Sequence, residues 1–564
     1  MSDSDSYMRL IRVLELHQSG TFQDNISKSL SAPDGLQIHW TRVLDIILLI
    51  AAQLISILRG FDFEKSLIIS GSFVSFSLYI VSVITIWWAS AGVWSRGQSF
   101  LSIVLYFSSS LTAAYAKIGN SDHHILMQFL FAASLGFAIR ALCPGARPVM
   151  AFAAGAAMGF GLWVNASMLM LAAPMIVAFG LSSLLLRNSK ELAGAGSRFC
   201  LGATAVVVAA IMLEKPPSAW ARVEYDRVSI VHLSALLVSL VMMRVLGRTV
   251  HWSGRSRFSF VSVCGAALML ILWLAFPAIP LGPLGDADLG FREIAAPLIP
   301  EMWPLPPLRE GGLRETVAYL GGAWLAGVIA LTLAAPRWSS RGMGAIALLL
   351  GSTLCVCIVG SFATRRLALE LAVPAAIAGA GLIAELVRLP RPKCVELRHL
   401  LAGSVTAVIL VTPVFINLPS VPTAMVEGCD DKAAIDWLAE VRPVWRPGEA
   451  APIVMSSNFH IGPEIVWRSG YRAVASGYHR GGHALSDTVT VFGSRNMDEV
   501  YDILDRRGVD IIMTCDSVPN LSVHPGSLLW RMTARNVPVW LRPLSLPPQL
   551  EHYRIYIVSP RNML

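Results

Sequence analysis

Six residues decide how this chain is interpreted: Gly119-Asn120-Ser121-Asp122-His123-His124. They place one carboxylate and two imidazoles between two long apolar runs. An ionisable side chain at bilayer depth costs at least about 2.5–3.5 kcal/mol, so such residues usually line a cavity or a site. We therefore expect the membrane side that carries this cluster to carry the chemistry. In the alternative interpretation, Asp122 simply caps the helix that begins at His123.

The composition around this cluster is that of a polytopic membrane protein. Of 564 residues, 54% are hydrophobic and only 15% are charged. The formal charge of +8 is explained by basic cytoplasmic loops, so we expect no nucleic-acid partner.

Long apolar runs predict about twelve membrane-spanning helices, because a span needs about 20 residues. Residues 44–58 are apolar but too few, so we expect a helix that lies on or dips into the membrane surface. The twelve expected spans are residues 67–92, 99–118, 123–141, 148–164, 167–186, 199–213, 229–247, 258–279, 316–335, 342–362, 369–388 and 400–418.

The distribution of Arg and Lys assigns the sides of the membrane. Alternate connections are rich in basic residues, as in Arg244, Arg248, Arg255 and Arg257, and such connections face the cytoplasm. The 119–124 cluster, the N-terminal segment and everything after residue 418 then face outward. This assignment of sides requires that residues 44–58 do not cross the bilayer.

The fold class that follows is a polytopic α-helical membrane protein with a C-terminal extracytoplasmic α/β domain. We expect a first-loop segment with surface helices over 1–66, a transmembrane helical domain over 67–418 and a periplasmic α/β domain over 419–564. Alternating apolar runs and helical patterns indicate the last domain. They are the strands Pro452–Met455, Val509–Thr514 and Tyr553–Val558 and the helices Asn496–Arg507 and Ser527–Arg535.

Two cysteines belong to this outward region. Cys429 and Cys515 face the oxidising side, where a disulfide can form and persist. Two buried free thiols are the equally weighted alternative.

Charged pairs near the outward face suggest a phosphate site. Asp3 and Asp5 form an acid-x-acid pair that can share a divalent cation, although acidic termini are commonly just solvated. Arg365 and Arg366 stand at an outward span end, where they can bind a phosphate or extend to the lipid headgroups.

Two outward loops add weaker candidates. Glu214 or Asp226 could join a metal or serve as a base, although solvated loop charge is the commoner explanation. Tyr478 and His479 lie in a tail loop dense in glycine, aromatic and polar residues, which predicts ligand binding.

Together these motifs resemble a known family. The chain carries Asp-x-Asp-x-Tyr-Met-Arg at 3–9, Pro-x-Gly-x-x-x-His-Trp-Thr-Arg at 33–42 and Asp-His-His at 122–124. With many spans and an outward tail, it resembles bacterial integral-membrane glycosyltransferases of the GT-C class, and most closely those related to the oligosaccharyltransferase catalytic subunit.

The resemblance implies an activity and a set of site residues. Such enzymes transfer a sugar from a polyprenyl-phosphate or polyprenyl-pyrophosphate donor to a glycan, lipid or protein acceptor at the outer face of the bacterial inner membrane. It implies a divalent cation, Mg²⁺ or Mn²⁺, and the roles fall on motif positions. The catalytic acids would be Asp3, Asp5 and Asp122; the metal ligands Asp5, Asp122, His123 and His124; and the lipid-phosphate contact Arg365 or Arg366. Beside these, we expect Arg9, His39, Tyr478 and His479 to contact the substrate.

Two departures from the family pattern keep rival functions open. Family members carry a span before the first acidic motif, and a Trp-Trp-Asp-Tyr-Gly motif in the tail, neither of which is found here. We expect either a late start or a truncated protein, and a peptide acceptor is doubtful. One rival is a transporter or flippase in which the Asp-His-His cluster carries ions or protons. The other is an inactive membrane scaffold.

Overall fold

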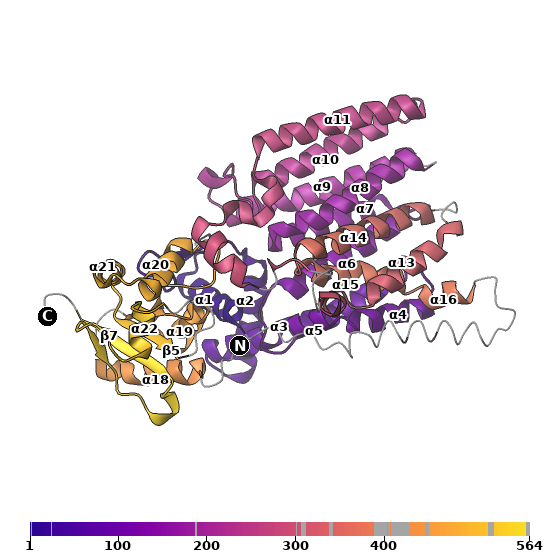
Figure 1. The fold of residues 1–564 in the computed structure, drawn as a ribbon. Helices are drawn as coiled ribbons and strands as arrows, with labels where there is room; N and C mark the ends of the chain where they lie inside the picture. Colours follow the sequence, from indigo (N-terminus) through magenta and orange to yellow (C-terminus); the bar gives the residue numbers. More distant parts are fainter. Residues whose placement is uncertain are drawn as a thin grey trace.

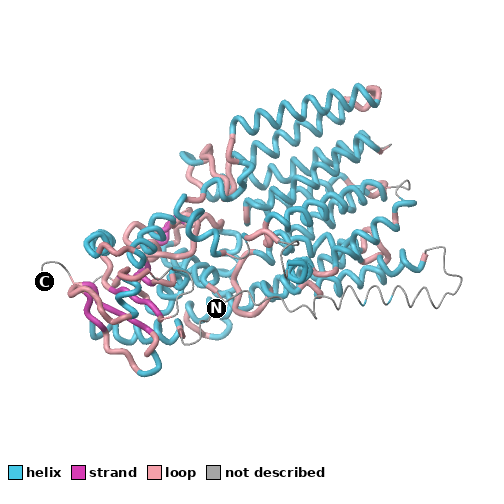
Figure 2. The backbone as a smooth tube through the Cα atoms, viewed as in Figure 1, coloured by secondary structure: helices cyan, strands magenta, loops and turns pink. Residues whose placement is uncertain are grey.

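The computed structural model consists of a helical bundle with a sheet-containing domain at one end (Figure 1). It describes residues 1, 3–23, 25–186, 189–299, 302–305, 312–337, 342–388, 403, 407, 429–445, 451–516 and 524–559. Figure 2 shows helices throughout the bundle and the strands of the larger sheet gathered in the C-terminal domain.

The bundle begins with long helices that are apolar on most of their surface. Seven described helices are long and apolar enough to cross a membrane, and a bent pair brings the number to eight. We therefore describe the chain as a multi-pass membrane protein. The bundle helices are α3 (Phe63–Ser90), α4 (Arg96–Phe107), α5 (Ser110–Tyr115), α6 (His124–Leu142), α7 (Pro148–Val164), α8 (Leu169–Leu185), α9 (Ser189–Glu214), α10 (Ile230–Arg248), α11 (Gly254–Ala275), α12 (Gly312–Leu320), α13 (Ala323–Leu333), α14 (Met343–Ala363), α15 (Leu367–Gly379) and α16 (Leu382–Val387).

Three of the expected continuous spans are interrupted instead. The expected span 99–118 divides into α4 and α5, because Ser109 Oγ accepts the backbone N–H of Thr112 and starts a new helix. The expected span 316–335 bends by 72° between α12 and α13, where Gly321 has a positive φ. The expected span 369–388 divides into α15 and α16. The expected span 400–418 lies outside the continuous described segments.

The segment before the bundle contains α1 (Ser4–Ser19), β1 (Ile26–Ser27), β2 (Leu36–Gln37) and α2 (Arg42–Arg59). Helix α2 covers the expected surface helix, and it is not among the helices long and apolar enough to cross. One of its faces packs into the bundle core through Leu44 and Leu48. The opposite face leaves Leu54 and Ile57 exposed.

The C-terminal domain is an α/β layer structure whose predicted strands and helices are confirmed. Its sheet has the order β4-β3-β5-β7-β6, and β3 and β5 are buried along their whole length because helices cover both faces. Cys429 and Cys515 form a disulfide. The elements are α18 (Asp431–Trp445), β3 (Ile453–Ser456), α19 (Gly462–Ser469), β4 (Arg472–Ala473), α20 (Gly482–Gly493), α21 (Met497–Arg507), β5 (Ile511–Cys515), α22 (Leu528–Thr533), β6 (Leu541–Pro543) and β7 (Tyr553–Val558).

The first segment also joins the edge of this sheet. Ala473 of β4 donates its N–H to Ser29 O at 2.9 Å and accepts the N–H of Ala32 at 3.0 Å. Nearby, Trp40 and Tyr478 share an apolar cluster. The N-terminal segment, the C-terminal domain and the end of the bundle therefore meet in one region.

Candidate active site

The first acidic motif lies at the start of α1. Asp3 is the N-cap of this helix, and its Oδ1 accepts the backbone N–H of Ser6 at 2.8 Å. Asp5 follows in the first turn, and both acids are exposed. The acid pair therefore begins a helix at the point where the first segment reaches the bundle.

A buried hydrogen bond ties this helix start to the stretch before α6. Ser121 donates its backbone N–H to Ser6 Oγ at 2.9 Å, and both residues are fully buried. Gly71 of α3 leaves the room for this approach, because a Cβ there would lie 2.8 Å from Ser121 Oγ. The structure therefore brings the first motif, through Ser6, next to the neighbour of Asp122.

Asp122, His123 and His124 form a closed buried cluster. His123 Nδ1 lies 2.5 Å from Asp122 Oδ1, and His124 Nε2 lies 2.9 Å from Asp122 Oδ2. Their ligand atoms all lie within 4.8 Å of one another, and the three residues are 3–6% exposed. The N-cap of α6 is His123 and not Asp122, the residue that the alternative interpretation placed there. The Asp122 carboxylate faces the two imidazoles and accepts the backbone N–H of His123 at 2.7 Å.

The surroundings orient both imidazoles. Asn165 Nδ2 lies 2.7 Å from His123 Nε2, and this contact fixes the orientation of the ring, with Nδ1 toward Asp122. The ring of Tyr115 packs edge-on against His124 at a centroid distance of 4.6 Å. His124 Nδ1 is buried and has no hydrogen-bond partner among the described residues.

The charge of Asp122 follows from these contacts. Burial works to raise the pKa of this carboxyl, but the imidazoles of His123 and His124 outweigh burial and hold its pKa well below the usual range. Asp122 is therefore ionised at neutral pH. One carboxylate and two imidazoles with an orphaned ring nitrogen fit a divalent cation.

Arg9, predicted to contact substrate, is engaged within the protein. Its Nη1 lies 2.9 Å from Asp45 Oδ1, and its guanidinium stacks over Trp40 at 4.1 Å from the ring centroid. The side chain is 2% exposed. Trp40 in turn lies 6.1 Å from the ring of His123, so Arg9 supports one wall of the cluster.

The arginine pair lies at the start of α15. Arg365 is paired with Glu315, with 2.6 Å between Nη2 and Oε1, and its backbone N–H is donated to Trp303 O at 2.9 Å. The guanidinium also lies 5.1 Å from the Trp303 ring centroid. Arg366 is half-buried at the N-cap of α15.

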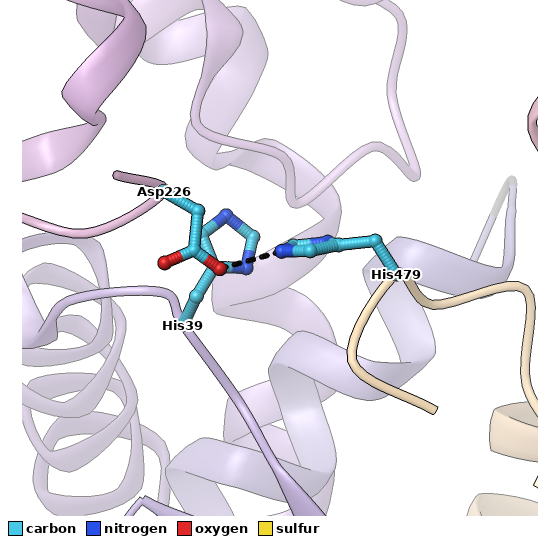
Figure 3. Close-up of side chains that lie close together, drawn as sticks. All are labelled: His39, Asp226 and His479. Carbon is cyan, nitrogen blue, oxygen red and sulfur yellow. Dashed lines mark hydrogen bonds and ion pairs between the residues drawn. The ribbon is translucent and has the colours of Figure 1, made fainter. Parts of the chain in front are cut away.

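The remaining predicted contacts gather in a second cluster, drawn in Figure 3. His39 from the first segment, His479 from the C-terminal domain and Asp226 from the loop after α9 bring their ligand atoms within 4.8 Å. His39 donates its backbone N–H to the hydroxyl of Tyr478 at 2.7 Å. The tail loop that was expected to bind a ligand therefore lies against the first segment.

Two residues of these clusters were not among the predicted site residues. Arg480 binds Asp226 through both of its carboxylate oxygens, and Asn165 orients His123. The sequence had offered Asp226 only as an alternative to Glu214 for a metal ligand or a base. The available signal for Asn165 was its position at the turn between two apolar runs, whereas nothing local distinguishes Arg480.

Comparisons with known proteins establish the fold. No family model matches the sequence, and no curated protein matches it. The solved structure of the oligosaccharyltransferase AglB from Archaeoglobus fulgidus with an inhibitory peptide and a dolichol-phosphate aligns with a TM-score of 0.71 and 15% identity, over 91% of this chain and 65% of that chain.

Two further structures of AglB from the same organism agree. The complex with Zn and sulfate gives a TM-score of 0.66 and 13% identity, over 91% of this chain and 64% of that chain. The apo form aligns with a TM-score of 0.68 and 14% identity, over 91% of this chain and 66% of that chain. The chain spans about two thirds of the length of these AglB chains. This likeness confirms the fold class: the chain is a helical membrane protein with the GT-C fold of the oligosaccharyltransferase AglB, to which its motifs had pointed.

Proposed function

We propose that this chain is a membrane glycosyltransferase. It transfers a sugar from a polyprenyl-phosphate or polyprenyl-pyrophosphate donor to a glycan, lipid or protein acceptor, on the periplasmic face of a bacterial inner membrane. The observation that carries the proposal is the buried Asp122–His123–His124 cluster, joined to the first acidic motif by the bond between Ser121 and Ser6. The GT-C fold supports it, and AglB has been solved with a dolichol-phosphate.

A divalent cation fits the cluster. Asp122, His123 and His124 would hold it, with Asp5 as the residue that the first motif contributes. Imidazole donors suit transition metals better than Mg²⁺, so we favour Mn²⁺ or Zn²⁺, and AglB has been solved with Zn. When bound, the cation offsets the negative charge that develops on the departing phosphate.

The chain's own residues would do the remaining work. Asp5 is exposed at the start of α1, where its carboxylate can orient an acceptor or take its proton. Asp3 caps the same helix and holds Asp5 in its first turn. Arg365 and Arg366, at the start of α15, are the proposed phosphate ligands, and Arg365 also pairs with Glu315.

One observation favours a transporter as the second candidate. Glu370 of α15 is 3% exposed, and its Oε2 has no hydrogen-bond partner among the described residues. Buried acids in membrane helices commonly relay protons. Glu370 lies in the first turn of α15, so it belongs to a helix end and not to a helix centre, where a transport site would be expected.

The test is metal-dependent sugar transfer by the purified protein, with a panel of polyprenyl-phosphate-linked and polyprenyl-pyrophosphate-linked sugars. We expect Asp122→Asn to lower kcat by at least about 100-fold, because the developing phosphate charge loses its stabilisation. Asp5→Asn should also lower turnover. Glu551→Gln, a change at an exposed acid of the C-terminal domain, is the matched control.

Two outcomes would contradict the proposal. Full turnover in both Asp122→Asn and Asp5→Asn, at unchanged membrane abundance, would exclude the site. An inert wild-type protein that moves protons or lipid across vesicles in a Glu370-dependent manner would instead establish the transporter.

A further inference from the structure

The second cluster joins three parts of the chain that are far apart in sequence. His39, Asp226 and His479 come from the first segment, the loop after α9 and the C-terminal domain, and Figure 3 shows their side chains converging. His479 Nε2 lies 2.7 Å from Asp226 Oδ2, and the rings of His39 and His479 meet edge to face at 4.4 Å. Two imidazoles and one carboxylate are a common set of zinc ligands.

The carboxylate of this set is held in place. Asp226 is 1% exposed, and Arg480 binds it with Nε 2.7 Å from Oδ2 and Nη2 2.5 Å from Oδ1. Asp226 is therefore an oriented carboxylate, fixed by hydrogen bonds from neighbouring side chains as metal ligands commonly are.

The hydroxyl of Tyr478 orients one imidazole. It accepts the backbone N–H of His39 and also contacts His39 Nδ1. When Nδ1 carries the proton toward Tyr478, the lone pair of Nε2 is free to bind a cation.

The charge around the cluster favours a cation. Asp286 Oδ2 accepts the N–H of Asp226 at 3.0 Å, and Glu224 contacts both Arg480 and Lys215. Three carboxylates, those of Glu224, Asp226 and Asp286, thus face two cations, those of Lys215 and Arg480. A net negative charge beside two imidazoles is stabilised by a bound divalent ion.

We propose that His39, Asp226 and His479 bind a divalent transition metal, with zinc as the best fit, which links the C-terminal domain to the first segment and to the loop after α9. The site shares no residue with the Asp122–His123–His124 cluster. Zinc takes the place of the hydrogen bond between His479 Nε2 and Asp226 Oδ2, and the single proton of the neutral imidazole is then carried on Nδ1.

Zinc stoichiometry of the full chain tests this site separately from the proposed transferase. Protein purified in detergent is stripped with a chelator and dialysed against Zn²⁺, and bound metal is measured by mass spectrometry. Wild type should retain two ions and Asp122→Asn one, while His479→Gln should lose the other with at least about a tenfold weaker affinity. His483→Gln, at an exposed histidine four residues away, should behave as wild type.

The visible absorption of bound Co²⁺ gives a second, independent measurement of the same site. Co²⁺ bound by two imidazoles and one carboxylate gives visible absorption bands at either cluster. Asp122→Asn protein should keep the bands of the second cluster, and adding His39→Gln to that variant should remove them. Wild-type zinc stoichiometry in both His39→Gln and His479→Gln, or loss of all zinc in Asp122→Asn alone, would overturn the proposal. Neither readout requires turnover, so loss of the second site and failure of the transferase are distinguishable.

Discussion

At the scale of single residues, buried charge is organised around Asp45 as well as around Asp122. Arg9, Arg12 and Arg42 bind the Asp45 carboxylate with N–O distances of 2.9, 2.6 and 3.1 Å, and all four side chains are buried. These contacts hold α1 against α2 and so place the first acidic motif. A buried charge that loses its partner is destabilising, because it remains out of water without compensation.

Asp45→Asn should therefore destabilise the protein strongly. It leaves three buried guanidiniums without their shared carboxylate, and we expect a loss of about 3–5 kcal/mol, read as a lower Tm in detergent. Asp62→Asn is the control, because it keeps an oxygen that can cap α3 and should cost far less. Equal Tm values for the two variants would contradict this role of Asp45.

The same group predicts a pH dependence. Burial opposes ionisation of Asp45, but Arg12, Arg9 and Arg42 lower its pKa from 3.8 to about 2. A lowered pKa in the folded state stabilises the fold above the unfolded pKa, and this contribution is lost as the pH falls through 3.8 toward about 2. The Tm difference between wild type and Asp45→Asn should therefore be constant near neutral pH and shrink below about pH 4. A difference that grows on acidification would contradict the assignment.

At the scale of elements, small residues set how closely the helices pack. A Cβ on Gly155 of α7 would lie 1.8 Å from the carbonyl oxygen of Phe199 in α9, and one on Gly202 of α9 would lie 2.2 Å from Phe152 O. Glycines at such contacts let membrane helices approach backbone to backbone. The sequence shows these glycines but does not show which helix each one faces.

Gly155→Val should separate α7 from α9. The new side chain would clash with the backbone carbonyl oxygen of Phe199, which cannot rotate away as a flexible side chain could. We expect a marked loss of monodisperse protein after extraction and a lower Tm. Gly351→Val in α14 is the control, since a Cβ there meets nothing within 4 Å. Equal yields for the two variants would show that this close packing is not required.

The exposed apolar face of α2 predicts how that helix meets the membrane. Ile50, Leu54 and Ile57 are 51%, 54% and 79% exposed and recur at helical spacing, as expected for a helix that lies at the bilayer surface. Cysteines introduced at Gln37 and Arg59, on a background without the other free cysteines, should both react with an impermeant maleimide added from outside. Labelling from opposite sides would make α2 a crossing helix.

At the scale of the whole molecule, a covalent link stabilises the C-terminal domain. The Cys429–Cys515 disulfide joins residues 86 positions apart and connects the segment before α18 to the end of β5. A link over a loop of this length typically contributes about 2–4 kcal/mol. Cys515→Ser should lower the unfolding temperature of this domain, and reduction should change the gel mobility of wild type but not of the variant. Identical mobility of wild type with and without reductant would exclude the bond.

The sequence was sufficient for those parts of the fold that depend on local pattern. Apolar runs predicted the long helices, and alternating runs predicted β3, β5 and β7 within a few residues. It was insufficient where a helix is interrupted, because the capping bond of Ser109 and the bend at Gly321 outweigh hydrophobicity. The fold class is confirmed, while the roles of the site residues and the domain limits remain predictions.

For the candidate site, too, the sequence was sufficient for one part and the tertiary structure was needed for the other. Asp122, His123 and His124 are consecutive, so the sequence alone placed a carboxylate beside two imidazoles at the end of an apolar helix, where ionisable residues are costly and hence informative. Only the tertiary structure placed Ser6 on Ser121 and brought His39, Asp226, His479 and Arg480 together. Those residues lie up to 441 positions apart, from His39 to Arg480, and the packing of the C-terminal domain against the first segment determines their contacts. Local pattern reveals which residues are chemically able to act, whereas long-range packing decides which of them meet.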